Sequence, residues 1–144
     1  MKSVVQMIEL LNSSLSDEYK HFHFYINAAM RVQGLHRNQI RQLLLAEAAS
    51  EMTHVSEFGD LIVGLGGIPT TSVNGFRNDL TDVKSILQYA CEMEDEVVAN
   101  YIGYKKEAQE LGGVHGGVIE IFLDNQILQS RTDSDNLRSM IKGM

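Results

Sequence analysis

The sequence has one cysteine, Cys91, in 144 residues, which excludes a disulfide bond within the chain and fits a reducing compartment. No segment approaches the roughly 20 consecutive apolar residues of a transmembrane helix. The opening segment MKSVVQMIELL reaches the charged Glu9 before an apolar run of signal-peptide length forms. We therefore expect a cytoplasmic protein without a membrane partner.

Basic residues are few and scattered. Twelve lysine and arginine residues stand against nineteen aspartate and glutamate residues, which gives a formal net charge of −7, and no basic run occurs. Duplex DNA is bound mainly through cationic side chains that contact its phosphates, so a nucleic-acid partner is not expected. A negative surface suits a protein that attracts small cations, and it equally serves solubility.

Tryptophan is absent, proline occurs once, and the residues typical of strands do not form short alternating runs. Apolar residues instead recur at alternating steps of three and four, which is the periodicity of amphipathic helices. The first of these stripes starts at Ser3 and Gln6, whose spacing is that of a helix capping box. The four stripes predict helices over approximately residues 4–33, 37–65, 81–111 and 117–132.

Glycines and the single proline separate the stripes. Gly66, Gly67 and Pro69 end the second one, and the connection over residues 66–80 is rich in turn formers. Short connections force neighbouring helices to be antiparallel, whereas a loop of ~15 residues can run the length of a bundle. The predicted fold is an all-α antiparallel four-helix bundle, a single domain over residues 1–144, with one long crossover between its second and third helices.

Several ionisable side chains fall on stripes that are otherwise apolar. A buried carboxylate without a partner is costly and tends to take up a proton. Three carboxylates and one imidazole at similar heights therefore favour a metal site, with buried ion pairs or edge positions as the alternative. Two of them are three residues apart on one helix, as two ligands of one ion require, and such donors suit iron or manganese, with zinc as a further option. These side chains are Glu18, Glu51, His54 and Glu94.

Glu-x-x-His on one helix with single glutamates on other helices is the ligand pattern of ferritin-like di-iron proteins. The chain resembles the bacterioferritin family in the pieces LNSSLSDEYKHFHFY, SEMTH, GLGGIP and DVKSILQYACEMED, and more weakly in VIEIFLDN. The resemblance implies a ferritin-like bundle that oxidises Fe(II) with oxygen or peroxide and stores the mineral in a hollow shell. It also implies that the iron ligands and catalytic residues of this ferroxidase centre are Glu18, Glu51, His54 and Glu94.

The chain departs from the family pattern in its fourth helix. Where the family has a second Glu-x-x-His, this sequence has Asn125 and Leu128, flanked by the neutral Gln126 and Gln129 at the same spacing. The first metal position keeps its whole ligand set, but the second keeps Glu94 and lacks a nitrogen ligand. The sequence therefore predicts ferroxidase-type oxidation with a weakened second metal site. The family's short fifth helix is also missing after Leu128, which leaves the size of a shell open.

Some other residues are expected to bind haem or to lie near the predicted metal ligands. By the resemblance, Met52 would ligate the iron of haem b across a two-fold axis between subunits; the alternative is a methionine that fills an interface. Tyr25 and Asn125 are expected beside the metal ligands, with the Tyr25 phenol hydrogen bonded to a carboxylate. His21 is three residues after Glu18 and could serve as a spare ligand, but we expect it at the edge of its stripe, on the surface or behind the ligands.

Two functions of different class follow. The first is a bacterioferritin-like protein for iron oxidation and for storage or detoxification, with one or two irons per subunit. The alternative is a catalytically impaired ferritin-like subunit with a structural or haem-binding role in a homo- or hetero-oligomer. The surviving ligands favour the first, whereas Asn125 and Leu128 favour the second. The expected partner is a second copy of the chain, with a two-fold dimer as the smallest unit and a shell as the family precedent.

Overall fold

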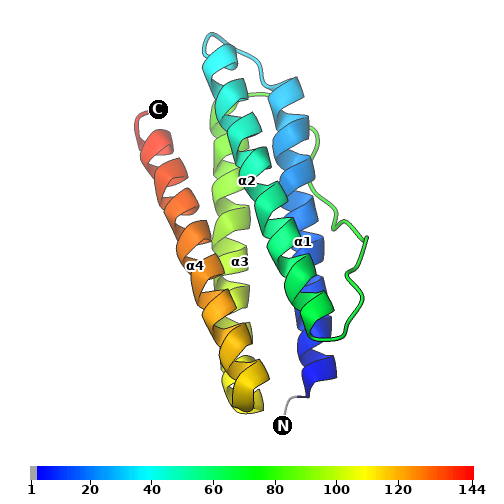
Figure 1. Cartoon of the computed structure of the whole chain (residues 1–144). Coiled ribbons are helices and arrows are strands. Elements are labelled where there is room, and N and C mark those ends of the chain that lie inside the picture. Colours follow the sequence, from blue (N-terminus) through cyan, green and yellow to red (C-terminus); the bar gives the residue numbers. More distant parts are fainter. Residues whose placement is uncertain (1–2) are drawn as a thin grey trace.

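The computed structural model describes residues 3–144, most of which belong to four long helices (Figure 1). Within this described range no strand forms, although Gln33 and Asp82 make an isolated bridge. The predicted all-α four-helix bundle is confirmed. Across the same residues, none of the helices is long and apolar enough to cross a bilayer. The helices are α1 (Val4–Arg31), α2 (Arg37–Gly64), α3 (Val83–Leu111) and α4 (Gly113–Lys142).

Side-chain caps fix the starts of α1 and α3. The Ser3 hydroxyl accepts the Gln6 amide hydrogen at 3.2 Å, and Gln6 Oε1 accepts the Ser3 amide hydrogen at 2.9 Å, so the predicted capping box is formed. Asp82 caps α3 by accepting the amide hydrogen of Ser85 at 3.0 Å. Each cap satisfies backbone groups that a helix end leaves without an internal partner.

The fourth helix is longer than the pattern predicted at both ends, since the expected range was 117–132. It starts directly after α3 because Gly112 and Gly113 have φ angles of 66° and 65°, a conformation that residues with a side chain rarely adopt. Its far end is held to α3 by Arg138, whose guanidinium lies 2.7 Å from the Asp95 carboxylate. The reversal therefore needs no loop, and the weakly patterned C-terminal segment is helical.

The connection between α2 and α3 runs along α1 on the outside of the bundle (Figure 1). The Asn12 side chain donates to the carbonyl of Ile68 at 3.1 Å and accepts the amide hydrogen of Thr70 at 2.8 Å. Further along, the Asn74 amide donates to Asp17 at 2.6 Å. The connection thus returns the chain to the end at which α2 began, so that α2 and α3 run parallel. This is the predicted crossover.

The core of the bundle has two apolar parts. The first includes Phe24, Leu44 and Leu87, and the second includes Leu11 and Leu123. On each helix the buried residues between these two parts are polar, so a polar layer crosses the middle of the bundle. Its members include Glu18, His21, Glu51, His54, Glu94, Gln126 and Ser130.

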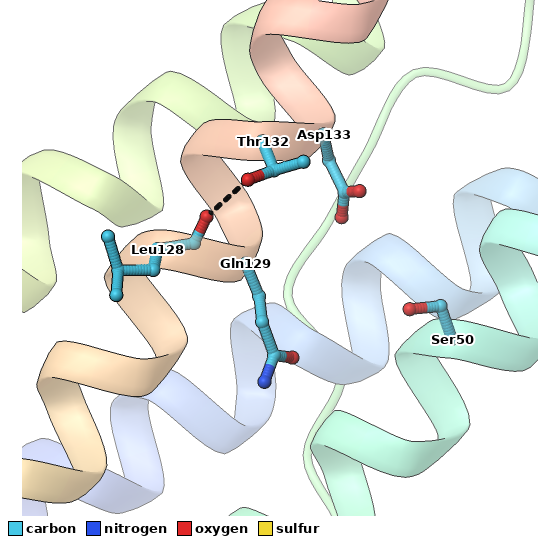
Figure 2. Close-up of a pocket in the computed structure, with 5 residues that line it drawn as sticks. All are labelled: Ser50, Leu128, Gln129, Thr132 and Asp133. Atoms are coloured by element: carbon cyan, nitrogen blue, oxygen red, sulfur yellow. Dashed lines mark hydrogen bonds between the residues drawn. The ribbon is translucent and has the colours of Figure 1, made fainter.

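A cleft of about 290 Å³ opens between α2 and α4 beside this polar layer (Figure 2). Gln129 lines the cleft, and its side chain contacts His54 of the layer. The cleft therefore leads from the surface toward the buried ionisable groups. Its lining residues are Ser50, Leu128, Gln129, Thr132 and Asp133.

Candidate metal centre

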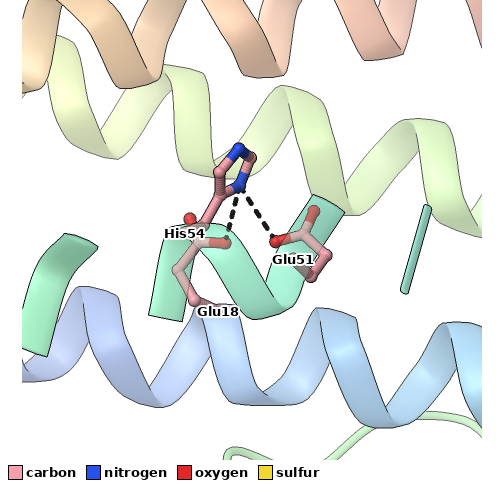
Figure 3. Close-up of side chains that lie close together, drawn as sticks. All are labelled: Glu18, Glu51 and His54. Carbon is pink, nitrogen blue, oxygen red and sulfur yellow. Dashed lines mark hydrogen bonds and ion pairs between the residues drawn. The ribbon is translucent and has the colours of Figure 1, made fainter. Parts of the chain in front are cut away.

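Glu18 of α1 and two residues of α2, Glu51 and His54, form a first cluster of ligand atoms (Figure 3). His54 Nδ1 lies 3.4 Å from Glu18 Oε2 and 3.2 Å from Glu51 Oε2. One ligand atom from each residue lies within 4.8 Å of the others, and all three residues are buried. Two ligand atoms bound to one ion at about 2.1 Å are roughly 3–4 Å apart. This first triad therefore has the spacing that a single metal ion requires.

Tyr101 of α3 orients the Glu18 carboxylate. The Tyr101 hydroxyl donates a hydrogen bond to Glu18 Oε1, so that Oε2 faces His54. Burial raises the pKa of Tyr101, and the nearby Glu18 carboxylate raises it further, so the phenol stays protonated and remains a donor. The Phe58 ring packs against Tyr101 at a centroid distance of 5.6 Å and restricts its movement.

The fourth helix acts on His54 through Gln129. His54 Nε2 lies 2.7 Å from Gln129 Oε1, an acceptor that requires the Nε2 hydrogen. With the proton held on Nε2, Nδ1 is left as the nitrogen that faces the Glu18 and Glu51 carboxylates. In the first triad (Glu18, Glu51 and His54), α4 therefore contributes a hydrogen bond that orients His54, and no metal ligand of its own.

His21 lies on the other side of Glu51 and forms a second cluster with Glu51 and Glu94. Its Nδ1 is 3.4 Å from Glu94 Oε1 and 3.7 Å from Glu51 Oε1, and the residue is 1% exposed. The surface placement expected for His21 is therefore wrong, since the residue is buried beside two of the predicted ligands. We refer to His21, Glu51 and Glu94 as the second triad.

The position of His21 follows from the packing of α1 against both α2 and α3. A helix with two neighbours buries a wide face, and on α1 this face includes the adjacent pairs Phe24–Tyr25 and Ala28–Ala29. The predicted apolar stripe took one residue per helical turn, and after Glu18 its next member was Phe22, so that His21 lay beside it. The signal in the sequence is the Glu18–His21 spacing, which suggests His21 as a spare ligand and repeats the spacing of Glu51 and His54.

Tyr25 makes the contact expected of it. Its hydroxyl donates to Glu94 Oε1 at 3.1 Å, and both residues are fully buried. Burial and the Glu94 charge raise the pKa of Tyr25, so it too remains a donor. Glu94 Oε2 has no hydrogen-bond partner and stays free for another ligand or ion.

On α4, the residues that lie inward or contact the centre are Gln126, which is buried, and Gln129, which is exposed but contacts His54, and not the predicted residues. Gln126 is fully buried and donates to Glu57 Oε2 at 3.4 Å. Asn125 is exposed, and Leu128 is 67% exposed. The placement of Asn125 beside the ligands is therefore wrong. The apolar stripe read from the sequence lies on the outer face of α4, whereas the inner face mixes apolar residues with Gln126, Ser130 and Ser134.

The ionisable groups of the two triads distribute their protons unevenly. Burial raises the pKa of Glu18, but hydrogen bonds with Glu51 and His54 outweigh it and lower the pKa to about 2. Burial and the Glu18 charge raise the pKa of Glu51 well above its ordinary value. Burial lowers the pKa of His54, but the Glu18 and Glu51 carboxylates reverse this and raise it to about 11. The carboxylates Glu51 and Glu94 likewise raise the pKa of His21 against the effect of burial. Without metal, protons therefore provide the positive charge of the centre.

Several buried atoms of the centre have no hydrogen-bond partner. Unpartnered polar atoms are rare in protein interiors because each loses its hydration without compensation. Carboxylate oxygens and imidazole nitrogens that lack a hydrogen-bond partner can instead bind a divalent cation such as iron or manganese. The residues present therefore fit a bound metal. The atoms are Glu18 Oε2, Glu51 Oε1, Glu94 Oε2 and both ring nitrogens of His21.

Met52 lies away from the centre on the outer face of α2. It is 50% exposed, and Leu45 and Ala49 on the same face are exposed as well. The side chain points away from the bundle, where a second molecule could contact it. The remaining histidines, His23, His36 and His115, are exposed and take no part in the centre.

Comparisons with known proteins give one family. The family of ferritin-like domains, Ferritin, matches residues 8–140. The bacterioferritin of Desulfovibrio desulfuricans is 25% identical over 143 residues, which cover 96% of this chain and 78% of that protein.

Solved structures of the same kind superpose along almost the whole chain. A ferritin-like, diiron-carboxylate protein of Bacillus anthracis has a TM-score of 0.88 and 27% identity, covering 98% of this chain and 99% of that one. The Rhodobacter capsulatus bacterioferritin, with a metal-free dinuclear site and a haem iron, has a TM-score of 0.85. Its identity is 19%, with 99% of this chain and 87% of that chain covered, so this likeness concerns the fold alone.

Proposed function

Because this chain belongs to the ferritin family, as a relative of the bacterioferritins, we propose that it binds ferrous iron in its polar layer and oxidises it for storage or detoxification. The observation that carries the proposal is the first triad. Glu18, Glu51 and His54 place two carboxylates and an imidazole within 4.8 Å of one another, inside a bundle whose other buried residues are mostly apolar.

The residues of the triad have distinct tasks in this function. Glu18, oriented by Tyr101, and Glu51 supply negative charge, which stabilises iron increasingly as it passes from the ferrous to the ferric state. His54 supplies a nitrogen ligand through Nδ1, with Gln129 holding the proton on Nε2. Each ferrous ion that reacts loses one electron to dioxygen or peroxide. The cleft between α2 and α4 gives ions and oxidant a route from the surface, past Asp133.

Oxidation of Fe(II) by the metal-free protein in air tests this proposal. We expect the ultraviolet absorbance of ferric iron to rise faster than in protein-free buffer, and Glu51→Gln to slow it more than tenfold, which corresponds to about 1.4 kcal/mol or more of barrier. Asp60→Asn, an exposed acidic position on the same helix, is the matched control and should leave the rate unchanged. A rate equal to that of buffer alone would contradict the proposal.

A second candidate function remains, namely a subunit with weak or no oxidation activity that contributes haem or structure to an oligomer. The observation that favours it is that the α4 side chain in contact with the centre, Gln129, is a neutral amide, as is the buried Gln126 one turn before it. The same assay separates the two functions, since an inactive chain that still assembles and binds haem supports this second one.

Both functions include self-association. Exposed large apolar side chains occur on all four helices, and on two of them several share one face: Leu45, Met52 and Val63 on α2, and Val114, Val118, Ile121 and Leu128 on α4. Monomers rarely expose so many on regular helix faces, and larger apolar patches usually mark interfaces. We propose a homo-oligomer with a two-fold dimer as its smallest unit. Sedimentation of the purified protein measures this directly, and a monomer at micromolar concentration would contradict it.

A further inference from the structure

We propose that a second metal ion binds in the middle of the bundle, held by His21 of α1, Glu51 of α2 and Glu94 of α3. The histidine from α1 then takes the place of a ligand that α4 does not supply. This inference rests on the proposed function for the identity of the ion, ferrous iron, but its geometry is independent of that identity.

The ligand atoms of the second triad have the spacing of a metal site. His21 Nδ1 lies 3.4 Å from Glu94 Oε1 and 3.7 Å from Glu51 Oε1, and all three ligand atoms fall within 4.8 Å of one another. Donors bound to one iron or zinc ion at about 2.1 Å are separated by roughly 3–4 Å. Small rotations of the side chains would close these distances around an ion.

The same atoms lack other partners. His21 is 1% exposed, and neither of its ring nitrogens has a hydrogen-bond partner. Glu51 Oε1 and Glu94 Oε2 are also without one. A histidine buried for packing alone would normally have at least one of its nitrogens hydrogen bonded. Its orientation toward two carboxylates therefore indicates a ligand.

Glu51 connects the two triads. Its Oε2 faces His54 at 3.2 Å, and its Oε1 faces His21 at 3.7 Å. A carboxylate with one oxygen directed to each side can bridge two ions, one next to each histidine. The chain thus has Glu-x-x-His on α1 (Glu18, His21) and on α2 (Glu51, His54), and Glu94 completes the set from α3.

The fourth helix contributes no side chain to either triad. Gln129 is hydrogen bonded to His54, and Gln126 to Glu57. Amide side chains are neutral, and the centre would keep three carboxylates for two dications. The half-buried Asp133 at the cleft adds negative charge nearby but is absent from both triads. His21 is therefore the nitrogen ligand on which the second ion depends.

Anaerobic titration of the metal-free protein with Fe(II) counts the ions. We expect two tightly bound per chain, and one in His21→Gln, which keeps a similar volume but removes the imidazole. His23→Gln changes an exposed histidine two residues further along α1 and should still bind two. Circular dichroism of each variant verifies that the helices are intact.

Crystals of the unmodified protein soaked in Fe(II) provide a measurement that needs no variant. Anomalous scattering should show a second ion within about 2.0–2.5 Å of a His21 ring nitrogen. Two ions in both the unmodified protein and His21→Gln, or an ion bound to α4 side chains instead, would overturn this inference. One ion in both proteins, at the first triad, would overturn it and leave the proposed function standing. No tight binding by the unmodified protein would overturn both.

Discussion

The Gln129 amide oxygen lies 2.7 Å from His54 Nε2, and this contact determines which nitrogen of the ring is presented to a metal. Partners of this kind behind a ligand commonly contribute 10- to 100-fold to metal affinity, because they fix the orientation and the protonation of the ring. Tyr101 and Tyr25 likewise orient carboxylates, because each donates a hydrogen bond to one of them, Tyr101 to Glu18 and Tyr25 to Glu94. At the residue scale, the centre is therefore held by neutral donors and acceptors from α1, α3 and α4.

The Gln129 contact gives the first prediction. Gln129→Leu should weaken the binding of the first ion about tenfold, since the freed His54 ring can rotate or carry its proton on Nδ1. Leu128→Ala, at an exposed position of the same helical turn, is the matched control. Competition with a chromophoric chelator measures both affinities. Equal affinities for the two variants would mean that His54 is oriented by its packing alone.

Glu47 gives a prediction about pH. Burial, and then the charge of Asp133, raise the pKa of Glu47 from 4.5 to about 7. Between these values the folded chain keeps a proton that the unfolded chain has lost, so the stability of the metal-free protein falls as pH rises from about 4.5 to 7. Because Glu47 is only half-buried, water screens the effect, and we expect Glu47→Gln to stabilise by about 1 kcal/mol at pH 8.

Urea unfolding of the metal-free Glu47→Gln variant at pH 4.5 and pH 8 measures this difference. At the lower pH the stability gain should be much smaller, because the native carboxyl is then largely protonated. Asp60→Asn, on the exposed face of α2, should show no such dependence on pH. The same gain at both pH values would show that the effect does not come from the proton.

At the scale of the elements, the turn from α3 to α4 depends on close backbone approach. A Cβ atom on Gly116 would lie 2.5 Å from the carbonyl oxygen of Ala108, whereas one on Gly117 would have no atom within 4 Å. Gly116→Ala should therefore destabilise the bundle by more than about 1 kcal/mol, because α4 has to move away from α3. Gly117→Ala should stabilise it by about 0.5–1 kcal/mol through helix propensity. Thermal unfolding of the two variants measures both, and equal melting temperatures would contradict the predicted clash.

The helices also show what the sequence could predict. Apolar periodicity and turn residues were sufficient for the four helices, the crossover and the buried positions of Glu18, Glu51, His54 and Glu94. Periodicity could not determine the register of α4, since this helix has apolar residues on both faces: Val118, Ile121 and Leu128 are exposed, whereas Ile119, Leu123 and Leu137 are buried. It also left His21 as a spare ligand at the edge of its stripe, because a polar residue beside a predicted stripe has no apolar periodicity of its own.

At the scale of the whole molecule, the exposed face around Met52 leads to a prediction about haem. The protein reconstituted with haem b should show the spectrum of a low-spin iron with two sulfur ligands, at one haem per two chains. Met52→Leu should abolish this uptake while changing the free energy of unfolding by less than about 1.5 kcal/mol, because leucine keeps the apolar volume. Haem titration and urea unfolding measure these quantities. No uptake by the unmodified protein would leave Met52 as an apolar interface residue.

The division of the two triads between the helices has a consequence for biosynthesis. Glu18, Glu51 and His54 all belong to the hairpin of α1 and α2, whereas the second triad needs Glu94 from α3. On the ribosome, every ligand of the first triad has been synthesised once residue 54 is added, before translation of the crossover begins. The second triad is completed only when the C-terminal hairpin docks against the first. An ion held there would connect the two hairpins, so we expect the order in which the ions load to follow the order in which the chain is made and folded.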